Sequence, residues 1–408
     1  MTTYTVTNTA GYLSASSDAD SIYVQSAAAK GSTILGNAGN DTIRLPEAIS
    51  DVSAAAPSLH GGAGDDSIFV LSAGYSAGGG ISVLGGGGAD TITIAGSGAL
   101  ASLKAGEDND SVTFVGGATA EYIGMSKGSD TLLISASVDA IGMGNGHDLI
   151  SGSTVTFLTA GYIKLGDGKD SIQAAELAGE SAAYINGDTT NTNGNADLID
   201  LNSTVTALTV RGGVGADTIT VSGFDGTALI AGNAGADSIG TVDLAVGLSL
   251  RGGAGNDTIT VSALEAEAVS IVGGADADSI YIQSILNGNA ASARIQGGAG
   301  ADTIRISGTS DQTNNLGTFV FSALSESTLG SIDIVDAGDG MSGAGSSAFF
   351  DFSNNASAAG AVGVESAATI FGSVTNRAIV TNSVVSLSGT TNVSSVTAAA
   401  ASVDKVVL

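Results

Sequence analysis

The chain has 408 residues, a formal net charge of −28 and only 12 Lys and Arg residues. This balance argues against nucleic acids and anionic membranes as partners, because phosphate contacts need clustered cations, and it favours a multivalent cation as counter-charge. The absence of cysteine excludes disulfides and thiolate metal sites, and an aromatic content of 4% argues against a conventional core of large side chains.

The N-terminal segment, Met1 to Ala10, has neither a basic nor an apolar stretch, so no cleavable signal peptide is expected. No run of about 18 apolar residues occurs anywhere, so no membrane span is expected. Residues 1–16 are expected to cap the element that follows.

A repeat of about 20 residues then occupies the chain as far as residue 306. Each copy is a turn of small residues that ends in an aspartate, usually followed by Ser or Thr and then by an aliphatic residue. The segment Gly252–Ile259 is the clearest copy. A period of this length indicates stacked units that contact mainly their neighbours. The repeat aspartates are Asp20, Asp41, Asp66, Asp90, Asp110, Asp130, Asp148, Asp170, Asp197, Asp217, Asp237, Asp257, Asp278 and Asp302.

Within each copy, the residue two positions before the aspartate is Gly, Asn or Asp, the types that tolerate positive φ, so a left-handed backbone is expected there in every copy. After the aspartate, aliphatic and polar residues alternate, which is the period of a strand with one inward face. A second aliphatic strand precedes each turn. We therefore predict an all-β fold, a right-handed parallel β-solenoid (β-roll) of about 14 coils over residues 1–306.

Stacking in register places one carboxylate per coil in a row. Two unit charges about 4.8 Å apart, the spacing of paired strands, repel by about 0.9 kcal/mol in water and by about 3.5 kcal/mol at an effective dielectric constant of about 20. Summed over the row, this cost exceeds the stability of an ordinary domain, which is about 5 to 15 kcal/mol. Calcium fits as the neutralising ion because it takes several carboxylate and carbonyl oxygens in a flexible geometry.

The segment Gly61–Phe69 matches the pattern G-G-x-G-x-D-x-U-x throughout, and so do the copies that open at Gly85, Gly212, Gly252 and Gly297. In these residues the chain resembles RTX-type β-roll proteins, over about residues 15–306. The resemblance implies multiple Ca²⁺ ions bound by the aspartates and turn carbonyls of successive coils. Because the motif occurs once per coil here, we expect the ions in a row along one edge.

The metal ligands implied by the resemblance fall into three groups. The repeat aspartates with well-formed turns are Asp41, Asp66, Asp90, Asp110, Asp148, Asp170, Asp217, Asp237, Asp257, Asp278 and Asp302. Asp108 and Asp276 replace a turn glycine and are expected to add ligands. Asp20, Asp130 and Asp197 are weaker assignments, because the turns before them depart from the pattern.

Residues 307–408 form a separate C-terminal region. Thr318–Leu324 resembles the β cap that closes RTX rolls, and Phe350–Phe352 resembles the stretch that follows it in the family. The tail Ala398–Leu408 resembles a C-terminal signal for type I secretion. The other interpretation is a cap or assembly region that hides the open edge of the solenoid, and the two are compatible.

The chain is not expected to be an enzyme, because it lacks metalloprotease, nucleophile-elbow and Walker motifs. His60 and His147 are expected in solvated turns. We expect an extracellular, calcium-stabilised structural protein, such as an S-layer, surface-matrix or adhesin component, whose partners are further copies of itself or cell-surface polysaccharide. The alternatives are a filament or virion appendage that uses the solenoid as a spacer, and an ice-binding or polysaccharide-active solenoid.

Overall fold

The computed structural model describes residues 2–6, 11–25, 31–45, 56–71, 80–179, 182–188, 195–244, 247–262, 268–283 and 294–306. Beyond them it describes seven short segments, 318–320, 334–336, 347–351, 369–370, 378–381, 395–399 and 406–407. It divides the chain into two compact units, Met1–Val205 and Thr206–Leu408. Each is a stack of strands, and each is described by itself.

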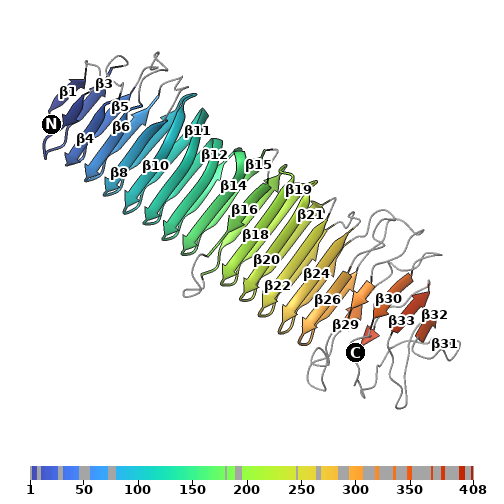
Figure 1. Ribbon diagram of the computed structural model, residues 1–408. Coiled ribbons are helices and arrows are strands. Elements are labelled where there is room, and N and C mark those ends of the chain that lie inside the picture. The colour runs from blue at the N-terminus through green and yellow to red at the C-terminus, as the bar shows by residue number, and fades with distance from the viewer. Residues whose placement is uncertain are drawn as a thin grey trace. The chain divides into compact units, whose positions relative to one another are not determined.

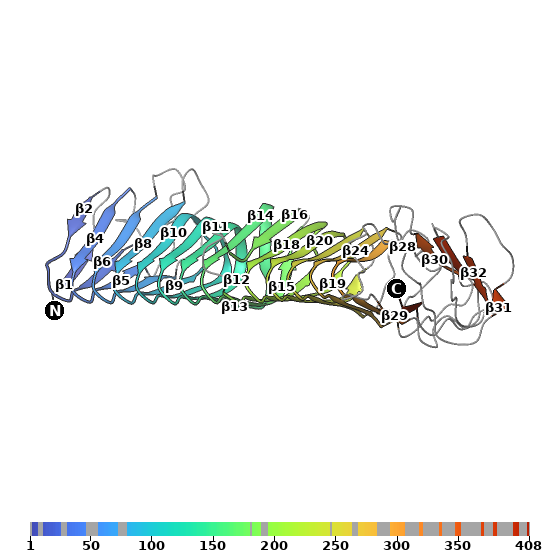
Figure 2. The ribbon, with the colours of Figure 1, turned by 90° about the horizontal axis from the view of Figure 1, so that it is seen from below.

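The first unit consists of strands that lie on two sides of a coil (Figures 1 and 2). Strands that precede a turn, such as β4 and β8, lie along one side, and strands that follow it, such as β5 and β9, lie along the other (Figure 2). The strands are β1 (Thr3–Val6), β2 (Tyr12–Ser14), β3 (Ser21–Val24), β4 (Thr33–Ala38), β5 (Thr42–Leu45), β6 (Ser58–Ala63), β7 (Ser67–Val70), β8 (Ile81–Gly87), β9 (Thr91–Ala95), β10 (Ala99–Glu107), β11 (Ser111–Lys127), β12 (Thr131–Asn145), β13 (Leu149–Gly152), β14 (Val155–Asp167), β15 (Ser171–Ala178), β16 (Ala182–Asn186) and β17 (Leu198–Ser203).

The second unit continues the same alternation of strands before and after a turn (Figure 1). Its strands are β18 (Ala207–Val214), β19 (Thr218–Phe224), β20 (Thr227–Ala234), β21 (Ser238–Leu244), β22 (Leu248–Ala254), β23 (Thr258–Val261), β24 (Val269–Ala275), β25 (Ser279–Ile282), β26 (Arg294–Ala299), β27 (Thr303–Ile306), β28 (Thr318–Val320), β29 (Ile334–Asp336), β30 (Ser347–Asp351), β31 (Thr369–Ile370), β32 (Ala378–Thr381), β33 (Ser395–Ala399) and β34 (Val406–Val407).

Strand pairing is parallel from coil to coil, and equivalent residues face one another. Ile43 pairs with Ile22 on one side and with Ile68 on the other, and all three side chains are buried. In the second unit Ile239 lies between Ile219 and Ile259 in the same way. These ladders confirm the predicted parallel β-solenoid with an aliphatic core. The structure has about 12 turns, slightly fewer than the 14 or so expected.

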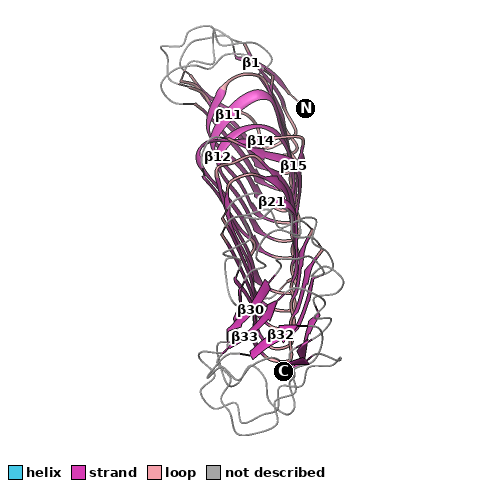
Figure 3. Ribbon diagram, turned by 90° about the vertical axis from the view of Figure 1, so that its right-hand side faces the viewer, coloured by secondary structure: helices cyan, strands magenta, loops and turns pink. Residues whose placement is uncertain are grey.

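Strands and loops account for all described residues, and no helix occurs among them (Figure 3). The part of the chain that the structure describes therefore offers no helix long and apolar enough to cross a membrane. His147 lies in a turn, as expected. His60 instead lies on β6, where it points away from the buried Leu59 and its Nε2 is 2.8 Å from the Ser58 hydroxyl.

Parallel pairing extends beyond Ile306. Phe319 of β28 pairs with Ile295, and Val335 of β29 pairs with Ile304. The last strands then reverse direction, since β33 and β34 run antiparallel to β30 and β29. Antiparallel strands on the final coil cover an open edge of the stack, which is what a cap requires. Leu324, Phe352 and most of the expected secretion signal lie outside the described residues.

Candidate metal centre

The repeat aspartates occupy the same place in every coil, directly before the strand that follows the turn. All fourteen are buried, with at most 3% of the residue exposed. A carboxylate is costly to bury unless it is paired or hydrogen-bonded, so their surroundings decide what they do.

One carboxylate oxygen, Oδ1, is used by the fold in every aspartate that follows another one within a unit. In the first unit the backbone N–H of Asp41 donates to Oδ1 of Asp66 at 2.7 Å, and that of Asp66 donates to Asp90 at 2.8 Å. The same bond links each pair of successive aspartates from Asp20 to Asp197 within this unit. It also links those from Asp217 to Asp302 within the second unit. The stacking of the coils therefore holds every one of these carboxylates in one orientation.

The other oxygen, Oδ2, is buried, and within the described residues it has no hydrogen-bond partner in most coils. This holds for Asp41, Asp66, Asp90, Asp110, Asp130, Asp148, Asp170, Asp237, Asp257 and Asp278. Native proteins leave few buried polar atoms unsatisfied, and a recurrent one indicates a missing ligand, ion or proton.

A glycine five residues before the aspartate makes room beside Oδ2. A Cβ atom added to Gly252 would collide with Oδ2 of Asp257 and with the carbonyl oxygen of Gly273 in the next coil. Gly36 has the same relation to Asp41 and the carbonyl of Gly61. We call this space, bounded by Oδ2 and the glycine five residues before it, the glycine cradle. The eight cradle glycines are Gly36, Gly61, Gly85, Gly212, Gly232, Gly252, Gly273 and Gly297.

The turn between the cradle glycine and the aspartate has a left-handed backbone at two positions. In the coils of twelve aspartates, all but Asp20 and Asp197, the structure gives a positive φ at the residue two positions before the aspartate, as at Gly64 (φ 116°). The prediction was therefore wrong for Asp18. For Asn195 it stays a prediction, because the residue before it lies outside the described residues. The residue four positions before the aspartate is also left-handed in the same coils, as at Gly62 (φ 125°).

Burial dominates the electrostatics of the aspartates. Desolvation, helped by the neighbouring carboxylates, raises the pKa of Asp66 to about 7 and that of Asp278 to about 8. The hydrogen bond that each Oδ1 accepts works in the opposite direction and is the weaker effect. Near neutral pH, a charged Oδ2 therefore needs a cation close to it.

The donor set of the glycine cradle fits calcium. It offers a carboxylate oxygen and, where the next coil approaches, a backbone carbonyl oxygen, which are the ligand types that Ca²⁺ takes at about 2.3 to 2.6 Å. The described residues contain no group of three or more His, Cys, Asp or Glu side chains that could hold a metal. An ion here would rest on one carboxylate per coil and on backbone oxygens, a set unlike the His and Cys ligands of zinc.

The sequence profile of the RTX calcium-binding nonapeptide repeat matches four segments, residues 31–45, 58–71, 249–263 and 286–305. The chain carries RTX calcium-binding repeats. All four matched segments contain a coil whose cradle position is glycine.

Other comparisons add less to the RTX assignment. No curated protein matches the chain. Among solved structures, it is similar to a hyperactive, Ca²⁺-dependent, beta-helical antifreeze protein from an Antarctic bacterium, at 20% identity and a TM-score of 0.42, over 68% of this chain and 84% of that chain.

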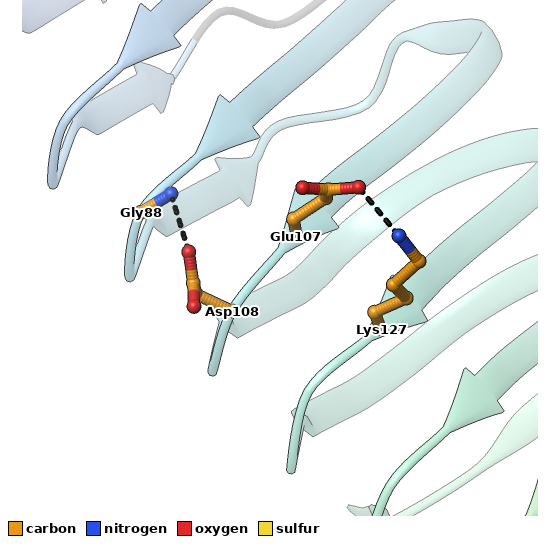
Figure 4. A network of polar contacts seen from close by, with 4 residues as sticks. All are labelled: Gly88, Glu107, Asp108 and Lys127. Atoms are coloured by element: carbon orange, nitrogen blue, oxygen red, sulfur yellow. Dashed lines mark hydrogen bonds and ion pairs between the residues drawn. The ribbon is translucent and has the colours of Figure 1, made fainter.

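Two predicted ligands, Asp108 and Asp276, lie away from the buried repeat aspartates. Asp108 and Asp276 have positive φ, as expected for residues that replace a turn glycine, but both are exposed on the outside of the turn. Oδ2 of Asp108 accepts a hydrogen bond from the N–H of Gly88 at 3.2 Å (Figure 4). These carboxylates add negative charge near the turn without entering the glycine cradle.

Asp20 also differs from the other repeat aspartates. Its Oδ2 accepts hydrogen bonds from the backbone N–H and the hydroxyl of Ser16, at 2.9 and 2.6 Å. Ser16 thus supplies what an ion would supply in a glycine cradle, and its hydroxyl is the main reason that the pKa of Asp20 is lowered. The weaker assignment of Asp20 as a metal ligand stays a prediction. The turn before Asp197 lies largely outside the described residues.

Reasoning from the sequence missed the role of the cradle glycine. The sequence motif indicated no separate role for its first glycine, whereas in the structure this glycine faces the carboxylate. The available signal was the identity of that residue from coil to coil. It is glycine in eight coils, but Ala105, Met125, Met143 and Leu165 stand there in four consecutive ones.

Proposed function

We propose that this protein is an extracellular structural protein whose coils are held together by calcium ions in a row along the turn edge of each unit. The observation that carries the proposal is the recurrence, coil after coil, of a buried Oδ2 beside a glycine cradle. The ligands would be Oδ2 of Asp41, Asp66, Asp90, Asp217, Asp237, Asp257, Asp278 and Asp302, completed by carbonyl oxygens of adjacent coils.

Such ions would act on stability rather than on chemistry. Each would neutralise a carboxylate in a row that is otherwise costly, and each would link two coils through oxygen atoms from both. Anything that binds the folded state and not the unfolded one stabilises the folded state by mass action. The solenoid would then assemble where calcium is present and lose stability where it is removed.

The charge of each site supports an extracellular location. One carboxylate per cradle is a low count, and calcium affinity rises with the number of charged ligands. Extracellular calcium modules bind with dissociation constants of about 10⁻⁴ to 10⁻³ M, weaker than cytosolic buffers. The absence of cysteine is compatible with oxidising surroundings.

The repetitive architecture favours a structural role at the cell surface. Repeats of one shape make up most of the described chain and expose long, regular faces. We propose an S-layer, surface-matrix or adhesin component, whose partners are further copies of the chain or cell-surface polysaccharide. Type I secretion would suit a calcium-dependent fold, which stays unassembled until it reaches calcium.

Circular dichroism and electron microscopy of the purified chain test the two parts of the proposal. We expect strand content and melting temperature to fall when a chelator removes calcium and to recover when calcium returns. Equal strand content and equal melting temperature in both conditions would refute the calcium claim. Electron micrographs in calcium should show sheets or a matrix. Isolated fibres would favour the spacer of a filament or virion appendage, and monomers would remove the assembly claim.

A further inference from the structure

Four consecutive coils of the first unit lack the glycine cradle. At the cradle position, five residues before Asp110, Asp130, Asp148 and Asp170, the chain carries Ala105, Met125, Met143 and Leu165. All four side chains are fully buried, with 0% exposure. The coils before them, of Asp41, Asp66 and Asp90, and those of Asp217 to Asp302 in the second unit, all have glycine there.

A side chain at this position takes the space that an ion needs. In the glycine coils even a single added Cβ would collide with Oδ2, as at Gly61 with Asp66 and at Gly85 with Asp90. Ala105 brings such a Cβ, and Met125, Met143 and Leu165 bring a longer apolar chain. The cradle is therefore filled by hydrocarbon, which offers a cation no ligand.

The same coils are held together in a different way. Strand β11 has 17 residues and β12 has 15, whereas β6 and β7, in coils with a glycine cradle, have 6 and 4. β11 and β12 pair from Ser111 opposite Thr131 to Lys127 opposite Asn145, with one irregularity between Val115 and Thr119. Backbone hydrogen bonds thus run around most of the coil and join neighbouring coils without an ion.

We propose that the calcium row is interrupted in the coils of Asp110, Asp130, Asp148 and Asp170, and that the residue five positions before each aspartate decides whether its coil takes an ion. This inference rests on the proposed function, since it selects among the same aspartates. The first unit then binds calcium at Asp41, Asp66 and Asp90, and its next four coils are calcium-free.

Two matched variants test the selection, Asp66→Asn and Asp148→Asn. Both aspartates are buried, both accept an N–H from the preceding aspartate on Oδ1, at 2.7 and 2.8 Å, and both have an unpartnered Oδ2. Asparagine keeps the size and one acceptor oxygen but removes the charge. The cradle residue, Gly61 or Met143, is the difference of interest between the two coils.

Calcium stoichiometry of the full chain is measured by calorimetric titration with calcium chloride and by elemental analysis of dialysed protein. We expect Asp66→Asn to bind at least one ion fewer than the wild type, and Asp148→Asn to bind as many as the wild type. Loss of an ion in Asp148→Asn would overturn the inference and leave the proposed function standing. A wild-type chain that binds no calcium would overturn the proposed function itself.

A gain of an ion provides the converse test and does not depend on losing a ligand. Ala105→Gly removes one methyl group and creates a glycine cradle next to Asp110. The preceding coil already has a glycine cradle, at Gly85. We expect this variant to bind one calcium ion more than the wild type. An unchanged stoichiometry in a folded Ala105→Gly variant, verified by circular dichroism, would overturn the claim that the cradle residue decides occupancy.

Discussion

The backbone N–H of Asp257 donates a hydrogen bond of 2.8 Å to Oδ1 of Asp278, one coil further along the second unit. Each aspartate therefore has two separate tasks. Oδ1 fixes the stacking of neighbouring coils, and Oδ2 faces the glycine cradle. A substitution that removes one of these tasks and keeps the other shows how much each oxygen contributes to stability.

At Asp278, replacement by asparagine should weaken calcium binding while it keeps the acceptor for Asp257. Replacement by alanine also leaves that buried N–H without a partner, at a cost of about 1 to 3 kcal/mol. We therefore expect Asp278→Ala to be less stable than the wild type with or without calcium. Asp278→Asn should be destabilised in calcium only. Denaturant unfolding in calcium and in chelator distinguishes the two variants, and equal behaviour would contradict the division of tasks.

The pH dependence of the calcium-free protein follows from the raised pKa values. A group whose pKa is higher in the folded than in the unfolded state adds stability at low pH, and this contribution is lost as pH rises through the folded value. Burial raises the pKa of Asp66, Asp110, Asp148 and Asp237 to about 7 and that of Asp278 to about 8, well above the usual range of an aspartate. In chelator, the melting temperature should fall between about pH 5 and about pH 9.

Calcium should reduce this loss, because an ion near Oδ2 lowers the pKa of the carboxyl and replaces the proton. The measurement is a series of thermal melts over this pH range with calcium and with chelator. A calcium-free protein that becomes more stable as pH rises would show that the aspartates are not held in the environment described here.

Adjacent glycines in one turn offer a test of the backbone. Gly86 has φ of 132°, and a Cβ there would collide with the carbonyl oxygen of Gly62, whereas a Cβ on Gly87 meets nothing within 4 Å. Gly86→Ala should therefore cost about 1 to 3 kcal/mol, the usual range for a residue held in an unfavourable backbone conformation. Gly87→Ala should change stability by about 0.5 kcal/mol or less. Denaturation midpoints in calcium provide the comparison, and equal effects would contradict the turn geometry.

A surface ion pair near the same edge should matter much less than the buried aspartates. Nζ of Lys127 lies 2.6 Å from Oε1 of Glu107 in the adjacent coil (Figure 4). The two side chains are 65% and 66% exposed. Exposed pairs contribute about 0 to 1 kcal/mol and are screened by salt. Lys127→Gln should lower stability by no more than this, and added sodium chloride should remove the difference. A larger loss that persists at high salt would show a role beyond the ion pair.

The fold was accessible from the sequence because its signals are local and repeated. The alternation of Ile43 and Leu45 with polar neighbours sets a strand with one inward face, and repetition of the pattern stacks such strands. The positive φ of the turn residues followed from the choice of Gly, Asn and Asp. These features depend on one coil at a time.

The site was only partly accessible, because its decisive contacts join different coils. That Oδ1 of Asp278 would accept the N–H of Asp257, and that Gly252 would face the carbonyl of Gly273, depends on how the coils stack. The hydrogen bond that the Ser16 hydroxyl donates to Oδ2 of Asp20 likewise depends on the direction of both side chains, which the sequence does not give. The sequence predicted which carboxylates form the site. It could not predict which of their two oxygens is left free of protein hydrogen bonds and can face an ion.

The most direct test of the calcium site is a high-resolution crystal structure grown in calcium, with anomalous scattering used to locate the ions. We predict anomalous peaks in the glycine cradles, each about 2.3 to 2.6 Å from Oδ2 of an aspartate such as Asp257 and from a backbone carbonyl oxygen. Cradles that hold only water, with Oδ2 of the same aspartates turned to a protein donor, would contradict the account.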